Sequence, residues 1–237
     1  MKIRCVWEHN GDDTLLHAAD FPGAFTRGEN LDVARRKMAK EIKAYAAWRA
    51  LDIDRVDEVE IVQESACELE VRDADSDVLF RSESEPLTLV EYQRLKALAC
   101  KSALDFFALY DSIPDKNRSV APARKTFYGQ APRTAEEMYR HTKHVNAYYF
   151  GEIGVEAEND GSIFACRQRG FETLEKQEGF LSNLVREGSY GEMWSLRKVL
   201  RRFLWHDRIH AKAMYKMAAG IWGRATIPDV FAFDGWM

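Results

Sequence analysis

The spacing of hydrophobic residues changes close to residue 86. Before it, apolar residues occur in short runs that alternate with polar ones, as with Ile3, Cys5 and Trp7, a pattern typical of strands with one buried face. From residue 88 onward, apolar residues recur every three or four positions over long stretches, which predicts amphipathic helices. The polar stretch SESEP at residues 82–86 separates the two patterns. We therefore predict an α+β protein with two domains, residues 1–85 and residues 87–237.

The first predicted domain is a small α+β unit of ββαβ type. Its helix should begin at Asn30, whose side chain is suited to capping free backbone amides. The apolar stripe of that helix is formed by Leu31, Ala34, Met38, Ile42 and Tyr45. Residues 26–30 and 73–77 are expected to form turns, the second of them within a hairpin. Strands are expected at residues 2–9, 14–19, 58–63, 68–72 and 78–81.

The second predicted domain is an up-down four-helix bundle. Its first two helices should begin at capping boxes, in which a threonine and a glutamate three residues later satisfy free backbone amides: Thr88 with Glu91, and Thr134 with Glu137. Pro114 should end the first helix. The third and fourth helices are expected at residues 161–185 and 192–221, and the apolar tail at 227–237 should pack back onto the bundle.

Charge is unevenly distributed along the chain, whose formal net charge is -4. Residues 1–86 carry 12 Lys and Arg against 20 Asp and Glu, a net charge of -8, whereas the remainder carries 22 against 18, a net charge of +4. An acidic first half lacks the positive charge that phosphate contacts require. A basic cluster on the fourth helix is interpreted as a solvated face: Arg197, Lys198, Arg201 and Arg202. We expect no nucleic-acid partner.

Cysteine usage and hydropathy bear on the cellular compartment. The four cysteines are far apart in the sequence and form no Cys-x-x-Cys pair, which is typical of reduced thiols in a cytosolic protein. The first residues contain no uninterrupted apolar run of the kind found in a signal peptide. No stretch approaches the ~20 apolar residues of a membrane span. We therefore expect a cytoplasmic protein that does not contact a membrane.

Three of the six histidines lie on predicted buried stripes. His206 and His210 are one turn apart on the apolar stripe of the fourth helix, and His141 lies on the apolar stripe of the second helix. Two imidazoles four residues apart on a helix can bind one metal ion. Spacing alone leaves this interpretation open against a structural one, in which each histidine is hydrogen-bonded within the core.

Two segments resemble the DinB/YfiT-like superfamily, and the resemblance covers about residues 87–225. Residues 134–150, TAEEMYRHTKHVNAYYF, resemble the second helix of that family. Residues 200–217, LRRFLWHDRIHAKAMYKM, resemble its fourth helix, which carries a His-x-x-x-His pair. The resemblance implies a four-helix bundle in which His141, His206 and His210 bind one divalent metal ion, zinc or nickel.

Residues 1–63 resemble the HicB-like antitoxin fold. The resemblance is carried by DFPGAFTRGENL at residues 20–31, an acidic-Pro-Gly turn followed by a second turn into a helix. It implies a protein partner for this domain, since HicB proteins bind a small basic toxin. HicB proteins usually continue into a DNA-binding tail, whereas this chain continues into predicted helices.

Three histidine ligands leave at least one coordination position open for water or substrate, as in catalytic metal sites. Characterised branches of the DinB-like superfamily include thiol-dependent S-transferases, so the resemblance implies a metal-dependent enzyme that acts on a small molecule with a low-molecular-weight thiol. A metal-dependent hydrolase and a non-catalytic binding or regulatory protein are the alternatives. Asp207 and Glu137 are candidates for orienting an imidazole. The sequence leaves open whether the chain forms a homodimer.

Overall fold

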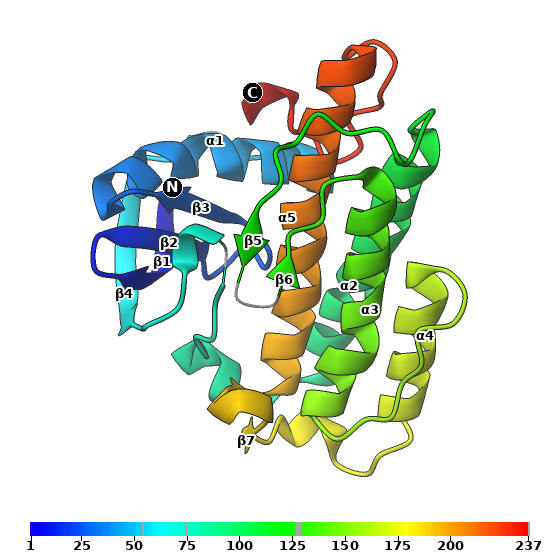
Figure 1. Ribbon diagram of the computed structural model, residues 1–237. Helices are drawn as coiled ribbons and strands as arrows, with labels where there is room; N and C mark the ends of the chain where they lie inside the picture. Colours follow the sequence, from blue (N-terminus) through cyan, green and yellow to red (C-terminus); the bar gives the residue numbers. More distant parts are fainter. Residues whose placement is uncertain (54, 74, 127–128, 237) are drawn as a thin grey trace.

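The computed structural model describes residues 1–53, 55–73, 75–126 and 129–236. It is a mixed α+β structure, in agreement with the fold class predicted from the sequence. A four-stranded sheet and one helix form the first part of the chain, and four further helices form the second part (Figure 1). The long last helix lies between the sheet and the other helices of the second part (Figure 1).

The sheet has the strand order β3-β2-β1-β4. Strands β1 (Lys2–Asn10), β2 (Asp13–Ala18) and β3 (Phe25–Gly28) follow one another as antiparallel neighbours. Helix α1 (Leu31–Arg49) then crosses to β4 (Glu58–Ala66), which pairs with β1 in parallel. A parallel pair needs such a crossover, whereas antiparallel neighbours can be joined by tight turns. Asn30 caps α1 as predicted, since its side chain accepts a hydrogen bond from the amide of Val33.

The two faces of the sheet are covered by different elements. Ile3, Cys5 and Leu16 pack with the apolar stripe of α1, in one hydrophobic cluster. Side chains that point to the opposite face pack against the segment of residues 71–80 and against the last helix: Val6, Leu15 and Phe25. In β1 and β2, alternating side chains therefore contribute to two buried faces, whereas the edge strand β4 has only half-buried and exposed residues.

Three predictions for the first part of the chain are wrong. β3 occupies residues for which a turn was predicted. The strands predicted at residues 68–72 and 78–81 do not form; 3₁₀ turns lie at Val71–Asp73 and Arg81–Ser84 instead. The turn predicted at residues 73–77 includes residue 74, which lies outside the described residues. The physical reason is that Val71, Val78 and Phe80 pack singly onto the sheet, while the last helix supplies hydrogen-bond donors to this segment.

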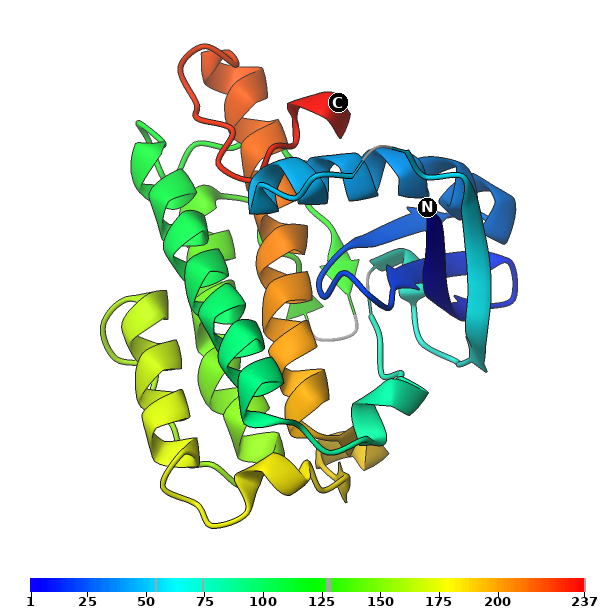
Figure 2. The ribbon, with the colours of Figure 1, turned by 180° about the vertical axis from the view of Figure 1, so that it is seen from behind.

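The second part contains helices α2 (Leu89–Ser112), α3 (Ala135–Glu152), α4 (Ile163–Leu174) and α5 (Leu196–Trp222). α2 and α3 each pack against both α4 and α5, so the four helices lie side by side (Figure 2). Both predicted capping boxes are present. A two-stranded ribbon of β5 (Lys125–Thr126) and β6 (Gly129–Gln130) lies in the long connection between α2 and α3.

The third helix is shorter than predicted, because it ends at Leu174 and not at residue 185. Gly179 and Asn183 adopt left-handed backbone conformations that no α-helix contains. The chain then forms a short ribbon of β7 (Arg186–Glu187) and β8 (Met193–Trp194) before α5. α5 begins later than predicted, because Ser195 is its N-cap and accepts a hydrogen bond from the amide of Lys198.

The basic cluster of α5 is not a solvated face, so that prediction is wrong. Lys198, Arg201 and Arg202 are 0%, 4% and 8% exposed. They donate hydrogen bonds to the backbone carbonyls of residues 76–78, and Arg201 also pairs with the buried carboxylate of Glu83. α5 is therefore buried on two sides, by the helices on one side and by the first part of the chain on the other.

The two predicted domains share one hydrophobic cluster, which contains residues of the sheet, α1, α2, α3 and α5. The apolar tail joins this cluster through Ile227, Phe231 and Phe233, which are at most 2% exposed. Separate folding of residues 1–85 and 87–237 stays a prediction. Within the described residues, no helix combines the length and apolar composition needed to cross a membrane.

Candidate metal centre

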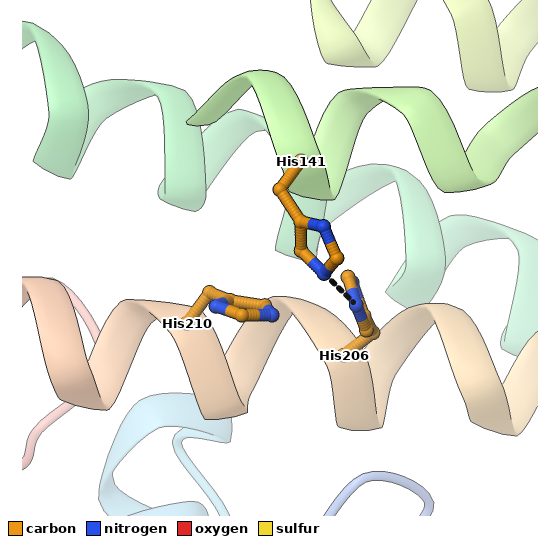
Figure 3. Close-up of side chains that lie close together, drawn as sticks. All are labelled: His141, His206 and His210. Carbon is orange, nitrogen blue, oxygen red and sulfur yellow. Dashed lines mark hydrogen bonds between the residues drawn. The ribbon is translucent and has the colours of Figure 1, made fainter. Parts of the chain in front are cut away.

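The three predicted histidines lie together where α3 faces α5. His206 and His210 are on successive turns of α5, and His141 points toward them from α3 (Figure 3). All three ring-centre separations lie between 4.5 and 5.0 Å. Helical spacing places the α5 pair on one face, and the packing of α3 against α5 brings in the third imidazole.

The nitrogen positions are compatible with one shared ion. The Nε2 atoms of His141 and His206 are 3.2 Å apart, and one nitrogen from each of the three rings lies within 4.8 Å of the others. Ligands about 2.0–2.1 Å from a tetrahedral zinc ion would be separated by about 3.3 Å. The His141–His206 pair already has about this spacing.

The environment keeps the three imidazoles neutral. Burial lowers the pKa of His206 well below its ordinary value, and the neighbouring His210 and His141 lower it further. Burial and His141 act in the same direction on the pKa of His210, as does the guanidinium of Arg27. The pKa of His141 is also lowered, by burial and by His144. Neutral imidazole is the form that binds metal ions, so these ligands are ready without loss of a proton.

A hydrogen bond between His141 and His206 is the alternative explanation for their short separation. It accounts for only two of the three rings, since it involves His141 and His206 alone. A metal ion would use one nitrogen of each ring at the same time. His206 is held from the side by the edge-on ring of Tyr149, with ring centres 6.1 Å apart.

The two residues proposed to orient an imidazole have other roles. Asp207 accepts two hydrogen bonds from Arg167, in an ion pair whose side chains are both 0% exposed. Glu137 caps the beginning of α3 through the amides of Arg133 and Thr134. Neither carboxylate is therefore available to a histidine, because each is already committed to hydrogen bonds that stabilise the fold.

The three histidines open into a cleft of about 1020 Å³ between the first and second parts of the chain. α3 and α5 line one side, with Tyr149, Trp205 and Ile209 beside the histidines. β3 and the segment before α2 line the other, and they contribute Arg27 and Asp75. The histidines are thus accessible to a small molecule, which a closed structural site would not be.

Comparisons of the chain with protein-family models, curated proteins and solved structures gave no match.

The sequence interpretation missed the polar residues that share the cleft with the histidines. Arg202 was assigned to a solvated face, although it lies four residues before His206 on the same helix and belongs to the same stripe. That spacing was the available signal. Arg27 and Asp75 were predicted to lie in turns, and no local pattern relates them to histidines that follow more than 60 positions later.

The buried histidines should make the metal-free protein sensitive to acid. Because their pKa values are lowered on folding, the unfolded chain binds more protons below pH 6.5, so the free energy of unfolding should fall as pH decreases. Each imidazole that stays neutral contributes a slope of at most about 1.4 kcal/mol per pH unit. Urea unfolding of chelator-treated protein between pH 7 and pH 5 measures this slope. His206→Gln should reduce the slope, whereas a slope unchanged in both His206→Gln and His210→Gln would contradict the prediction.

Proposed function

We propose that α2, α3, α4 and α5 form an up-down four-helix bundle of the DinB-like type, which binds one zinc or nickel ion through His141, His206 and His210. We further propose a metal-dependent transferase that joins a low-molecular-weight thiol to a small-molecule substrate. The observation that carries this proposal is the convergence of three neutral imidazoles on one cleft. The resemblance of residues 134–150 and 200–217 to that family supplies the reaction class.

The arrangement favours a catalytic site over a structural one. Among the described residues, the histidine cluster offers three ligands, whereas structural zinc sites are closed by four. A divalent ion with an open position lowers the pKa of a bound water or thiol. Around it, Tyr149 and Trp205 are buried aromatic side chains that would exclude water from a bound substrate.

A metal-dependent hydrolase is the second candidate, because the same three ligands and cleft would serve water in place of a thiol. The non-catalytic alternative, partner binding by the HicB-like part, has less support from the structure. α1 covers one face of the sheet, and α5 with residues 71–80 covers the other. A protein partner would have to use an edge of the sheet. Homodimer formation and the absence of a nucleic-acid partner stay predictions.

Cobalt substitution tests the proposal and separates the two enzymatic candidates. We expect cobalt-loaded protein to develop a thiolate-to-cobalt charge-transfer absorption when glutathione or cysteine is added, because a thiol would enter the open position as its thiolate. His141→Ala should abolish the absorption. His144→Ala is the matched control, since His144 is on the same helix but exposed, and it should behave as the wild type.

The other outcomes are equally informative. Cobalt binding without thiolate absorption, together with cobalt-dependent hydrolysis of p-nitrophenyl acetate that His141→Ala removes, would favour the hydrolase. Failure of the wild type to bind cobalt, zinc or nickel would contradict the metal site itself.

A further inference from the structure

The segment that links β4 to α2 is fixed along α5 close to the histidines. Arg202 donates a hydrogen bond to the carbonyl of Ser76, and Lys198 donates one to the carbonyl of Asp77. Arg202 precedes His206 by four residues on α5, a distance of about 6 Å along the helix axis. The backbone at Ser76 is therefore held by a side chain that begins about one helical turn before the first α5 ligand.

Asp75 is the acidic residue of this segment whose side chain is both buried and available. It is 9% exposed and lines the same cleft as the three histidines. Its Oδ2 atom has no hydrogen-bond partner among the described residues. Leaving a buried acceptor unpaired is costly, so such an atom in a cleft is suited to a donor that arrives with substrate.

The groups around Asp75 set its proton affinity. Burial raises the pKa of the Asp75 carboxyl to about 6, and the carboxylates of Glu70 and Glu8 raise it while Arg202 opposes them. Arg202 also acts on His206, whose pKa it lowers. One guanidinium thus lies near both Asp75 and the histidine cluster. At neutral pH the carboxyl is mostly ionised, and it can accept a proton and later return it.

We propose that Asp75 is a catalytic residue: it accepts the proton of the thiol or water that reacts at the histidine cluster. This inference rests on the metal-dependent function proposed above. The S–H or O–H bond of the nucleophile breaks, its electron pair stays on sulfur or oxygen, and an O–H bond forms at Oδ2 of Asp75. The protonated Asp75 then donates the same proton to the leaving group of the substrate, which restores the carboxylate.

Two other acidic residues of the cleft already have a cationic partner. Asp73 forms an ion pair with Arg124. Glu192 forms an ion pair with the buried ammonium of Lys198. Asp73 is therefore a matched control, because it lies in the same segment and carries the same charge but already has a partner.

The test follows the Asp75 carboxyl directly by infrared difference spectroscopy. In metal-free wild type, a protonated-carboxyl band should appear with a midpoint near pH 6, remain in Asp73→Asn and disappear in Asp75→Asn. Loading with cobalt should lower the midpoint by at least about one pH unit, since a nearby cation favours the carboxylate. Adding glutathione should move it back up, because a thiolate reduces the local positive charge.

A second measurement addresses proton transfer. Stopped-flow absorption should show the cobalt–thiolate species forming on the order of 100-fold more slowly in Asp75→Asn than in wild type or Asp73→Asn. Cobalt stoichiometry should be the same in all three.

A wild-type midpoint that neither cobalt nor glutathione moves, or equal rates in both variants, would overturn the role of Asp75 while leaving the metal site intact. If the wild type binds no cobalt, the proposed function fails and this inference fails with it. The wild-type infrared titration decides the question even if Asp75→Asn does not fold.

Discussion

Replacing His206 with alanine should weaken metal binding by at least about 100-fold, because loss of a direct ligand must exceed the 10–100-fold cost of losing a residue that merely orients one. Purified wild type should contain about one divalent ion per chain, since three convergent imidazoles form one site. Elemental analysis gives the metal content, and zinc titration against a competing chelator gives the affinity. The same result is expected for His141→Ala and His210→Ala.

The control for this experiment is His144→Ala, which removes an exposed imidazole from the same helix as His141 and should leave both quantities unchanged. Far-ultraviolet circular dichroism should be the same for all variants, because many apolar side chains other than the histidines hold α3 and α5 in place. Retention of a full equivalent of tightly bound metal by any of the three alanine variants would contradict the shared site.

Replacing Glu41 with glutamine should lower the free energy of unfolding by about 3–5 kcal/mol, a large share of the 5–15 kcal/mol typical of a folded protein. Glu41 of α1 is 0% exposed and accepts hydrogen bonds from Arg208 at 2.7 Å and Lys212 at 2.8 Å, both on α5. Burial alone would raise the pKa of Glu41, but the two cations overcome it and the pKa is lowered. Glutamine keeps the shape and leaves the buried Arg208 cation without a counter-charge.

Urea unfolding of the metal-free protein measures this change. Asp32→Asn, which removes an exposed carboxylate from the first turn of α1, should cost less than about 1 kcal/mol. Glu41→Leu combined with Arg208→Leu should cost less than Glu41→Gln, because Lys212 is the remaining cation and its side chain is 21% exposed. A loss below about 1 kcal/mol for Glu41→Gln would show that this pair does not join the two parts of the chain energetically.

The sequence predicted those residues of the candidate site that lie on the buried stripe of a helix. His206 and His210 are related by one turn of helix, and His141 lies in the corresponding stripe of α3, so periodicity alone predicted three inward-facing imidazoles. Asp75 and Arg27 were not predictable, because they reach the cleft from segments with no periodic relation to α5. The residues that lie across the cleft from the histidines depend on how the sheet packs against α5. That packing is set by contacts between residues that are far apart in the sequence.

The sequence by itself determined the features that depend on neighbouring residues. Asn30, Thr88 and Thr134 mark the beginnings of helices, because a cap needs only the amides of the next three residues. Alternation in β1 assigned Ile3 and Cys5 to one buried face, because successive strand residues point to opposite sides.

Only the tertiary structure decided which charged residues are buried. Lys198, Arg201 and Arg202 have the pattern of a solvated helix face, yet each of them donates a hydrogen bond to a segment more than 110 residues earlier in the chain, as Arg201 does to Glu83. Contacts of this kind also accompany the absence of the strand predicted at residues 78–81, since side chains of α5 donate hydrogen bonds to the carbonyls of Asp77 and Val78. A buried cation is stable only where an acceptor or a counter-charge lies close to it. When that acceptor belongs to a distant segment, no local pattern in the sequence predicts the contact.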